Sequence, residues 1–214
     1  MTINNDTLVT VTCQAILTVT RTTIDYVSEL PSWYPGTENK PAPMPLLRVQ
    51  GFVNTLDVED GTDRLVLPTV ARDWLVEAGL LGAGAAEPTA SELELARGVR
   101  ESIRSLIEGA AGDGGVEPMR EVAVAHRARL TVGDDGAVGL ENARDEELGD
   151  ALFELLLIIH EAQQDGSWSR LKVCANPDCR WAFYDRSRNQ QGNWCNMAVC
   201  GNRLKNRELR ARRR

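Results

Sequence analysis

Apolar residues recur every three or four positions through residues 46–165, a pattern that predicts amphipathic helices. The clearest helix begins after Thr89, because Thr89 and Glu92 match a capping box, and it ends at the glycines from Gly109 onward. Further helices are expected at residues 46–56, 68–78, 116–126 and 144–164. We therefore predict a helical domain and bound it at residues 46–165.

One part of this domain has a different pattern. Two short apolar segments flank residues 133–136, and the pair Asp135 and Gly136 is a turn signal for a β-hairpin. The fold class that we expect is mainly α, of the α+β kind, in which a helical N-terminal domain carries a small hairpin.

The first 45 residues are expected to be a flexible, Pro-rich leader. Five of the nine prolines fall within residues 29–45, where they oppose both a helix and a central strand. The change from Pro-rich to periodic sequence is abrupt. It motivates the hypothesis that the native protein starts at Met44 and that residues 1–43 are a start-site artefact.

The chain shows no signal for a membrane or for secretion. No run approaches the ~20 apolar residues that a membrane span needs, and the longest covers residues 155–159. The N-terminus has neither a basic start nor a continuous apolar block, so we expect a cytoplasmic protein. Cytoplasmic thiols stay reduced, which disfavours disulfides.

Charge is divided unevenly along the chain. The net charge is −7, yet residues 170–214 alone carry 12 basic and 3 acidic side chains, a local charge of +9. The remainder is strongly acidic. A basic segment of this density indicates a polyanionic partner, such as nucleic acid, for the C-terminal part.

Four of the five cysteines lie in this basic segment, as the pairs Cys174 with Cys179 and Cys195 with Cys200. Two close pairs joined by a loop suit a tetrahedral four-sulfur zinc site. The alternatives are two disulfides, or a redox or catalytic thiol. The reducing compartment disfavours disulfides. A reactive thiol is disfavoured because neither cysteine pair has a suitable base nearby. Four thiolate ligands leave no open position for a substrate, so the zinc would be structural.

The order of elements around the cysteines is that of a treble-clef zinc module, which we place at residues 166–214. Residues 181–194 are expected to form a two-stranded ribbon, with Asp185 and Ser187 tying its turn to the helix start. The second cysteine pair then opens a basic helix.

This helix is the candidate DNA-binding element. The expected contacts are Asn202, Arg203, Lys205, Arg207 and Arg210, together with Arg186 and Arg188 in the ribbon. Bound zinc would fix the start of the helix and present its charges to phosphates, while Asn and Arg side chains can read base edges. The alternatives are a solvated basic terminus, or a terminus that docks on the acidic part of the chain.

The motif "CANPDC…F…D…SRN…WCNMAVCGNR" resembles the CGNR zinc finger, named for the tetrad at residues 200–203. Residues 51–81 and the helices that follow are similar to the ABATE domain that usually precedes this finger. The resemblance implies a stress-induced bacterial transcription regulator, with a sensing domain and a DNA-binding finger. Members of the family often carry an Arg-rich stretch before the Trp-Cys pair, where this chain has "NQQGN", and the leader lies outside the family pattern.

Our functional hypothesis is a DNA-binding regulator in which a helical sensor controls the finger. An effector pocket is the hypothesis for Asn54, Thr55, Trp74 and Arg100, and a homodimer would supply the surface for sequence-specific binding. His160 is expected to be a core histidine. The first rival is a protein–protein interaction module; the second, an enzyme, lacks a convergent set of acid, base and nucleophile.

Overall fold

The computed structural model describes residues 30–34, 40–110, 112, 115–142 and 147–212. The helices are α1 (Leu46–Val53), α2 (Pro68–Glu77), α3 (Ala90–Ile107), α4 (Glu117–Ala125), α5 (Leu148–Gln164) and α6 (Asn202–Arg212). The strands are β1 (Leu56–Asp57), β2 (Thr62–Asp63), β3 (Ala128–Val132), β4 (Val138–Asn142), β5 (Leu171–Val173) and β6 (Ala182–Tyr184). Two short helical turns, η1 (Ser167–Arg170) and η2 (Met197–Gly201), precede β5 and α6.

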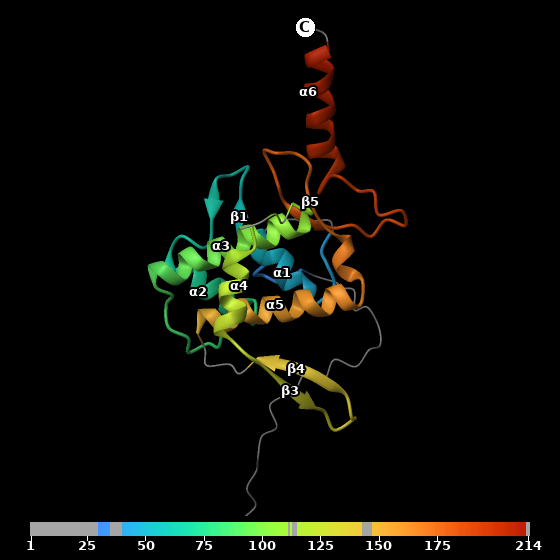
Figure 1. Cartoon of the computed structure of the whole chain (residues 1–214). Coiled ribbons are helices and arrows are strands. Elements are labelled where there is room, and N and C mark those ends of the chain that lie inside the picture. Colours follow the sequence, from blue (N-terminus) through green and yellow to red (C-terminus); the bar gives the residue numbers. More distant parts are fainter. Residues whose placement is uncertain (1–29, 35–39, 111, 113–114, 143–146, 213–214) are drawn as a thin grey trace, which may run out of the picture.

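The helical body is built around α1, which packs against α3 and α5 (Figure 1). Seven of the eight residues of α1 are buried, so this helix is the centre of the core rather than a surface element. α6 projects from the body at one end of the molecule, and the β3–β4 hairpin lies at the other (Figure 1). The mainly helical fold class predicted from the sequence is confirmed.

Local signals in the sequence account for these element boundaries. The Thr89 side chain accepts from the Glu92 N–H while the Glu92 carboxylate accepts from the Thr89 N–H, so the predicted capping box starts α3. The hairpin turns at Gly136, whose φ of +78° lies in the left-handed region that glycine adopts without strain. Its strands pair in antiparallel register, with Leu130 opposite Leu140.

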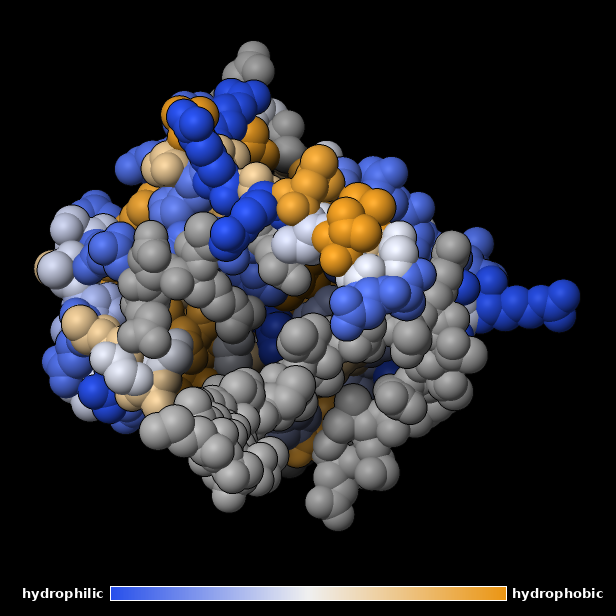
Figure 2. All heavy atoms as spheres, turned by 90° about the horizontal axis from the view of Figure 1, so that it is seen from below, coloured by the Kyte–Doolittle hydropathy of each residue, from blue (hydrophilic) through white to orange (hydrophobic). Residues whose placement is uncertain are grey.

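The hairpin exposes an apolar face. Side chains that alternate onto one side of the ribbon are largely open to solvent: Leu130, Val132, Val138 and, to a lesser extent, Leu140. Figure 2 views the molecule from the hairpin end and shows apolar residues on this surface. The hairpin therefore contributes little to the core, which lies between the helices.

The expectation of a flexible leader up to residue 45 is wrong for the part that the structure describes. Trp33, Tyr34 and Ala42 are buried in the core, and the Trp74 Nε1–H donates to the Trp33 carbonyl at 2.8 Å. Gly51 on α1 permits this packing, because a Cβ there would lie 2.7 Å from the Trp33 ring. Prolines exclude regular structure from this segment but not burial. Residues 1–29 and 35–39 lie outside the described residues.

The predicted ribbon within residues 181–194 is also wrong. β6 does form in this stretch, but it pairs in antiparallel register with β5, which precedes the first cysteine. The chain after β6 is instead folded back on Asp185. Its Oδ1 accepts from the Ser187 N–H at 3.0 Å and its Oδ2 from the Gly192 N–H at 2.7 Å.

None of the helices in the described parts of the chain is both long and apolar enough to cross a membrane.

Candidate zinc centre and nucleic-acid interface

The four C-terminal cysteines converge on one point. Their Sγ atoms all lie within 4.8 Å of one another, and all four residues are buried. Both the Cys179–Cys195 and the Cys195–Cys200 sulfur pairs are 3.7 Å apart. A disulfide needs about 2.05 Å between sulfurs, so these are separate thiols.

The same spacing fits a zinc ion. Four sulfurs placed tetrahedrally at about 2.3 Å from zinc lie about 3.8 Å from one another. Cys174, Cys179, Cys195 and Cys200 thus form the site for one zinc ion, as predicted. Four cysteines complete the tetrahedral sphere, so the ion would hold the fold together and would not act on a substrate.

Electrostatics within the cluster favour a cation. Hydrogen bonds from Cys179 and Cys195 lower the pKa of Cys174 to about 2. The same contacts with Cys174 raise the pKa of Cys179 to about 12, and they also raise the pKa of Cys195. One ionised sulfur therefore suppresses the ionisation of its neighbours. A divalent cation among them would offset this repulsion and allow further thiolates to form.

Backbone and side-chain caps place each cysteine pair. In the first pair, the Cys179 N–H donates to the Asn176 carbonyl at 3.0 Å, closing a tight turn. In the second pair, Asn196 follows Cys195, and its Oδ1 accepts from the Ala198 and Val199 N–H groups. This side chain caps η2, the turn that carries Cys200 into α6. The six residues from Cys195 to Cys200 thus contain both two zinc ligands and the cap that starts the helix.

A loop that follows β6 is held by Asp185. Besides the two backbone bonds, its carboxylate accepts from the Ser187 hydroxyl at 2.6 Å and lies 3.3 Å from Lys172 Nζ. Burial acts to raise the pKa of Asp185, but the bonds from Ser187 and Gly192 lower it overall. Asp185 and Ser187 therefore tie down this loop and β5; the expected tie to the helix start is not seen among the described contacts. A Cβ at Gly192 would lie 2.9 Å from the carboxylate, so a larger residue at this position would displace Asp185.

The predicted DNA-contacting residues are exposed. Five lie on α6 or at its start: Asn202, Arg203, Lys205, Arg207 and Arg210. Arg186 and Arg188 are exposed in the loop after β6, where Arg186 Nη2 donates to the Pro41 carbonyl at 2.7 Å. Arg203, Arg207 and Arg210 fall on one face of the helix, because their spacings of four and three residues match its period.

Two of these arginines have acidic partners within the chain. Arg203 Nη1 lies 2.5 Å from Glu59 Oε1, and this contact raises the pKa of Arg203. Arg207 Nη1 lies 3.1 Å from Asp178 Oδ2, within the first cysteine turn. Docking of the basic helix on the acidic domain was one of the alternatives drawn from the sequence, and among the contacts of the described residues it is seen for Arg203.

The finger is joined to the helical body through β6. Asn54 at the end of α1 donates from Nδ2 to the Ala182 carbonyl at 2.9 Å and accepts at Oδ1 from the Ala182 N–H at 2.7 Å. Gln50, one turn earlier, donates to the same carbonyl at 3.1 Å, and its Oε1 accepts from the Ala42 N–H. On this edge of β6, the side-chain amides of Asn54 and Gln50 bond Ala182 and the Lys40 carbonyl accepts from the Tyr184 N–H, so no strand among the described residues pairs there.

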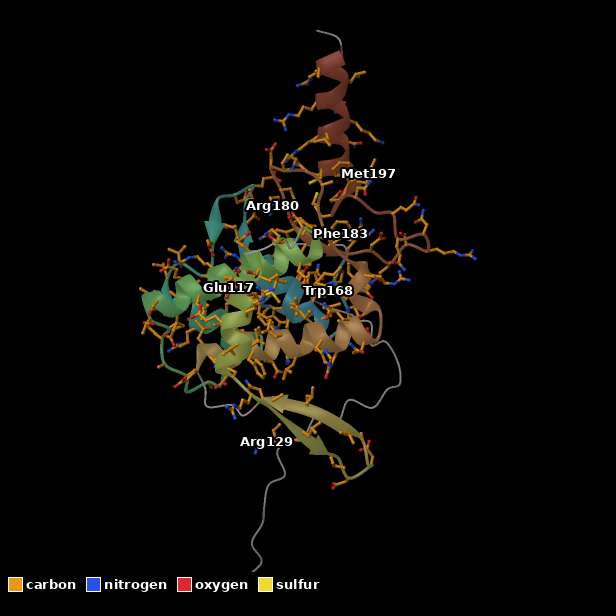
Figure 3. All side chains as sticks on the ribbon, viewed as in Figure 1. Glu117, Arg129, Trp168, Arg180, Phe183 and Met197 are labelled. Atoms are coloured by element: carbon orange, nitrogen blue, oxygen red, sulfur yellow. The ribbon has the colours of Figure 1, made fainter. Side chains whose placement is uncertain are left out.

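Arg104 on α3 makes a second link at this boundary. Its guanidinium is fully buried and donates to the carbonyls of Arg180, in the finger, and Val53, in the body. Burial lowers its pKa, and the nearby Glu101 carboxylate opposes that shift. Figure 3 shows Arg180 and Phe183 where the finger meets the body, with Met197 at the base of α6. The finger is thus built onto the helical domain.

The four residues of the effector hypothesis are buried and bonded inside the chain. Arg100 makes a two-pronged ion pair with Asp63, at 2.6 and 2.9 Å, and it also donates to the Thr55 hydroxyl. Trp74 packs edge-on against Trp33, and Asn54 faces the finger as described above. The structure brings Thr55 and Arg100 together and gives the other two separate contacts. The effector pocket stays a prediction.

The sequence analysis did not identify the residues that join the finger to the helical body. Lys40 Nζ donates to the Trp194 carbonyl at 2.5 Å and lies 4.6 Å from the centre of the Phe183 ring, although over 140 residues separate them in the chain. One signal was available. Gln50 and Asn54 are polar residues four positions apart, among the apolar residues of one helix, and such a pair on a buried face requires polar partners.

Comparison with known families agrees with this geometry. The model of the ABATE family, described as "Putative stress-induced transcription regulator", matches residues 49–163. The model of the CGNR zinc finger matches residues 170–213. Both matches confirm the resemblance drawn from the sequence. A search of curated proteins finds no match to this chain.

Proposed function

The chain belongs to the ABATE family and ends in a CGNR zinc finger, and from this premise we propose that it is a transcription regulator that binds double-stranded DNA through α6. The observation that carries the proposal is the start of that helix. Cys200, a zinc ligand, lies on the turn that runs directly into α6, so the metal site fixes where the helix points. A basic helix held in this way loses little freedom when it binds phosphates.

The dimensions and charges of α6 suit a DNA groove. Its 11 residues span about 16 Å, and a helix fits the major groove, which is about 12 Å wide. Arg203, Arg207 and Arg210 on one face can each reach a phosphate oxygen, and Asn202 can bond a base edge. Its projection from the body leaves its sides accessible (Figure 1).

The proposal also covers the oligomeric state, the role of the helical domain and the cellular location. A single 11-residue helix reads few bases, so sequence-specific binding would require two chains on two half-sites. We propose that the helical domain is a sensor, and that its effector binds near Thr55 and Arg100. We place this activity in the bacterial cytoplasm and without catalysis.

Loss of two arginines tests the DNA-binding proposal. We expect Arg207→Ala with Arg210→Ala to weaken binding of the zinc-loaded chain to duplex DNA about 10-fold or more, because two charge-assisted bonds are removed. The control is Arg120→Ala with Arg129→Ala, which removes the same charge at exposed positions on the body (Figure 3 labels Arg129). Affinity would be measured by fluorescence anisotropy at about 100 mM salt, where charged contacts remain strong. Equal losses in the two double variants would contradict a role for α6.

A protein-binding module is the second candidate, and exposed apolar side chains favour it. Met197, Val199 and Leu209 are each more than a third exposed on η2 and α6. An acidic partner with an apolar centre would match this surface. On that reading the zinc-loaded chain shows no measurable affinity for duplex DNA at low salt.

A further inference from the structure

The finger's first helical arginine is held by the helical domain. Glu59 lies on the turn between β1 and β2, and its carboxylate pairs with Arg203 across 144 residues of sequence. Both side chains are partly exposed, at 57% for Arg203 and 42% for Glu59. The pair is therefore open to exchange with a ligand from solution.

Hydrogen bonds within the turn fix the backbone that carries Glu59. The Asp57 carboxylate accepts from the Glu59 N–H at 2.9 Å and from the Asp60 N–H at 3.0 Å, and Gly61 closes the turn with a φ of +66°. The second strand of this ribbon carries Asp63, which pairs with the buried Arg100 of α3. The position of Glu59 is thereby linked to the core of the helical domain.

A carboxylate and a phosphate compete for the same arginine. Both present oxygen acceptors to the guanidinium fork, and Arg203 would have to leave Glu59 to make a full two-pronged contact with DNA. The acidic turn also repels the DNA backbone when the helix approaches it. Glu59 acts against binding on both counts.

We infer that the β1–β2 turn of the helical domain is an internal competitor of DNA, and that Glu59 restrains the finger by occupying Arg203. This inference rests on the proposed DNA-binding function. It gives the helical domain a direct means of regulation: any shift of the body that moves this turn away from α6 frees one arginine for phosphate.

Two single substitutions in the same turn test the inference. Glu59→Gln removes the charge that contacts Arg203, and Asp60→Asn removes an exposed charge of the same sign one residue away. Exposed ion pairs are weak, so we expect Glu59→Gln to tighten binding to a duplex about two- to five-fold at low salt, beyond the change seen for Asp60→Asn. The gain should shrink as salt rises, because salt screens the contact. Circular dichroism would check that both variants keep the helical fold.

A third variant separates contact from general charge. In a chain that already carries Arg203→Gln, Glu59→Gln should bring no gain beyond that of Asp60→Asn, because the arginine that it releases is gone. If the wild-type chain binds DNA and the two turn variants change affinity equally, the inference is overturned while the proposed function stands. If no variant binds the duplex at any salt concentration, both are overturned.

Discussion

At the scale of single residues, Asn54 makes the joint between the two parts of the molecule. Its side-chain amide forms two hydrogen bonds with the backbone of Ala182, and it is 1% exposed. The asparagine amide carries a donor and an acceptor on one short side chain, whereas aspartate, which has the same shape, lacks the donor when it is ionised.

We predict that Asn54→Ala lowers the free energy of unfolding by about 2 kcal/mol, because the buried Ala182 N–H loses its acceptor and cannot reach water. Urea unfolding of the zinc-loaded chain, followed by tryptophan fluorescence, measures this change. Asn206→Ala is the matched control, since Asn206 is exposed on α6 and should shift stability by less than about 0.5 kcal/mol. Similar effects of the two substitutions would show that the amide pair does not hold the joint.

Some of these residues could be assigned a role from the sequence and others could not. The zinc ligands were predictable, because each pair is local and its spacing reflects one turn of chain. Gln50 and Arg104 were not assigned to the joint, because their partners lie 132 and 76 residues away in sequence. Periodicity shows that such a side chain lies on a buried face. It does not show what the side chain meets there.

At the scale of elements, local sequence signals predicted the helices but did not predict the short strands. α3 begins at a capping box and α2 at a proline, both of which act within one turn. β6 has only three residues, and its partner strand could lie on either side of it in the sequence. Asp185 settles the choice, since it draws the following loop into a tight fold and leaves β5 to pair with β6.

The segment before α1 shows how a Pro-rich sequence can still act as part of the core. We predict that a chain starting at Met44 loses about 3–5 kcal/mol of stability relative to one starting at Leu30, because only the longer chain keeps the buried Trp33 and Tyr34 rings. Urea denaturation of both chains gives the difference. Equal unfolding midpoints would mean that this segment is dispensable, as the Met44 start-site hypothesis requires.

At the scale of the whole molecule, the sequence predicted two modules in order, and the structure adds that they are joined. β6 is bonded to β5 on one edge and to α1 and the Lys40 carbonyl on the other. The four cysteines form one buried cluster with Phe183 of this strand, so the ion would stabilise both the finger and its attachment. α6 then leaves the body from a fixed base and carries the basic face outward.

The central claim is that this basic face binds phosphates, and a salt series of DNA affinity tests it most directly. The zinc-loaded chain would be titrated with a labelled duplex between about 50 and 200 mM salt, the range in which counterion release is readily seen. Three or four phosphate contacts from α6 predict that the logarithm of the association constant falls against the logarithm of salt concentration with a slope of about −2.7 to −3.6. A slope near zero, or binding too weak to detect even at the lowest salt, would contradict the account.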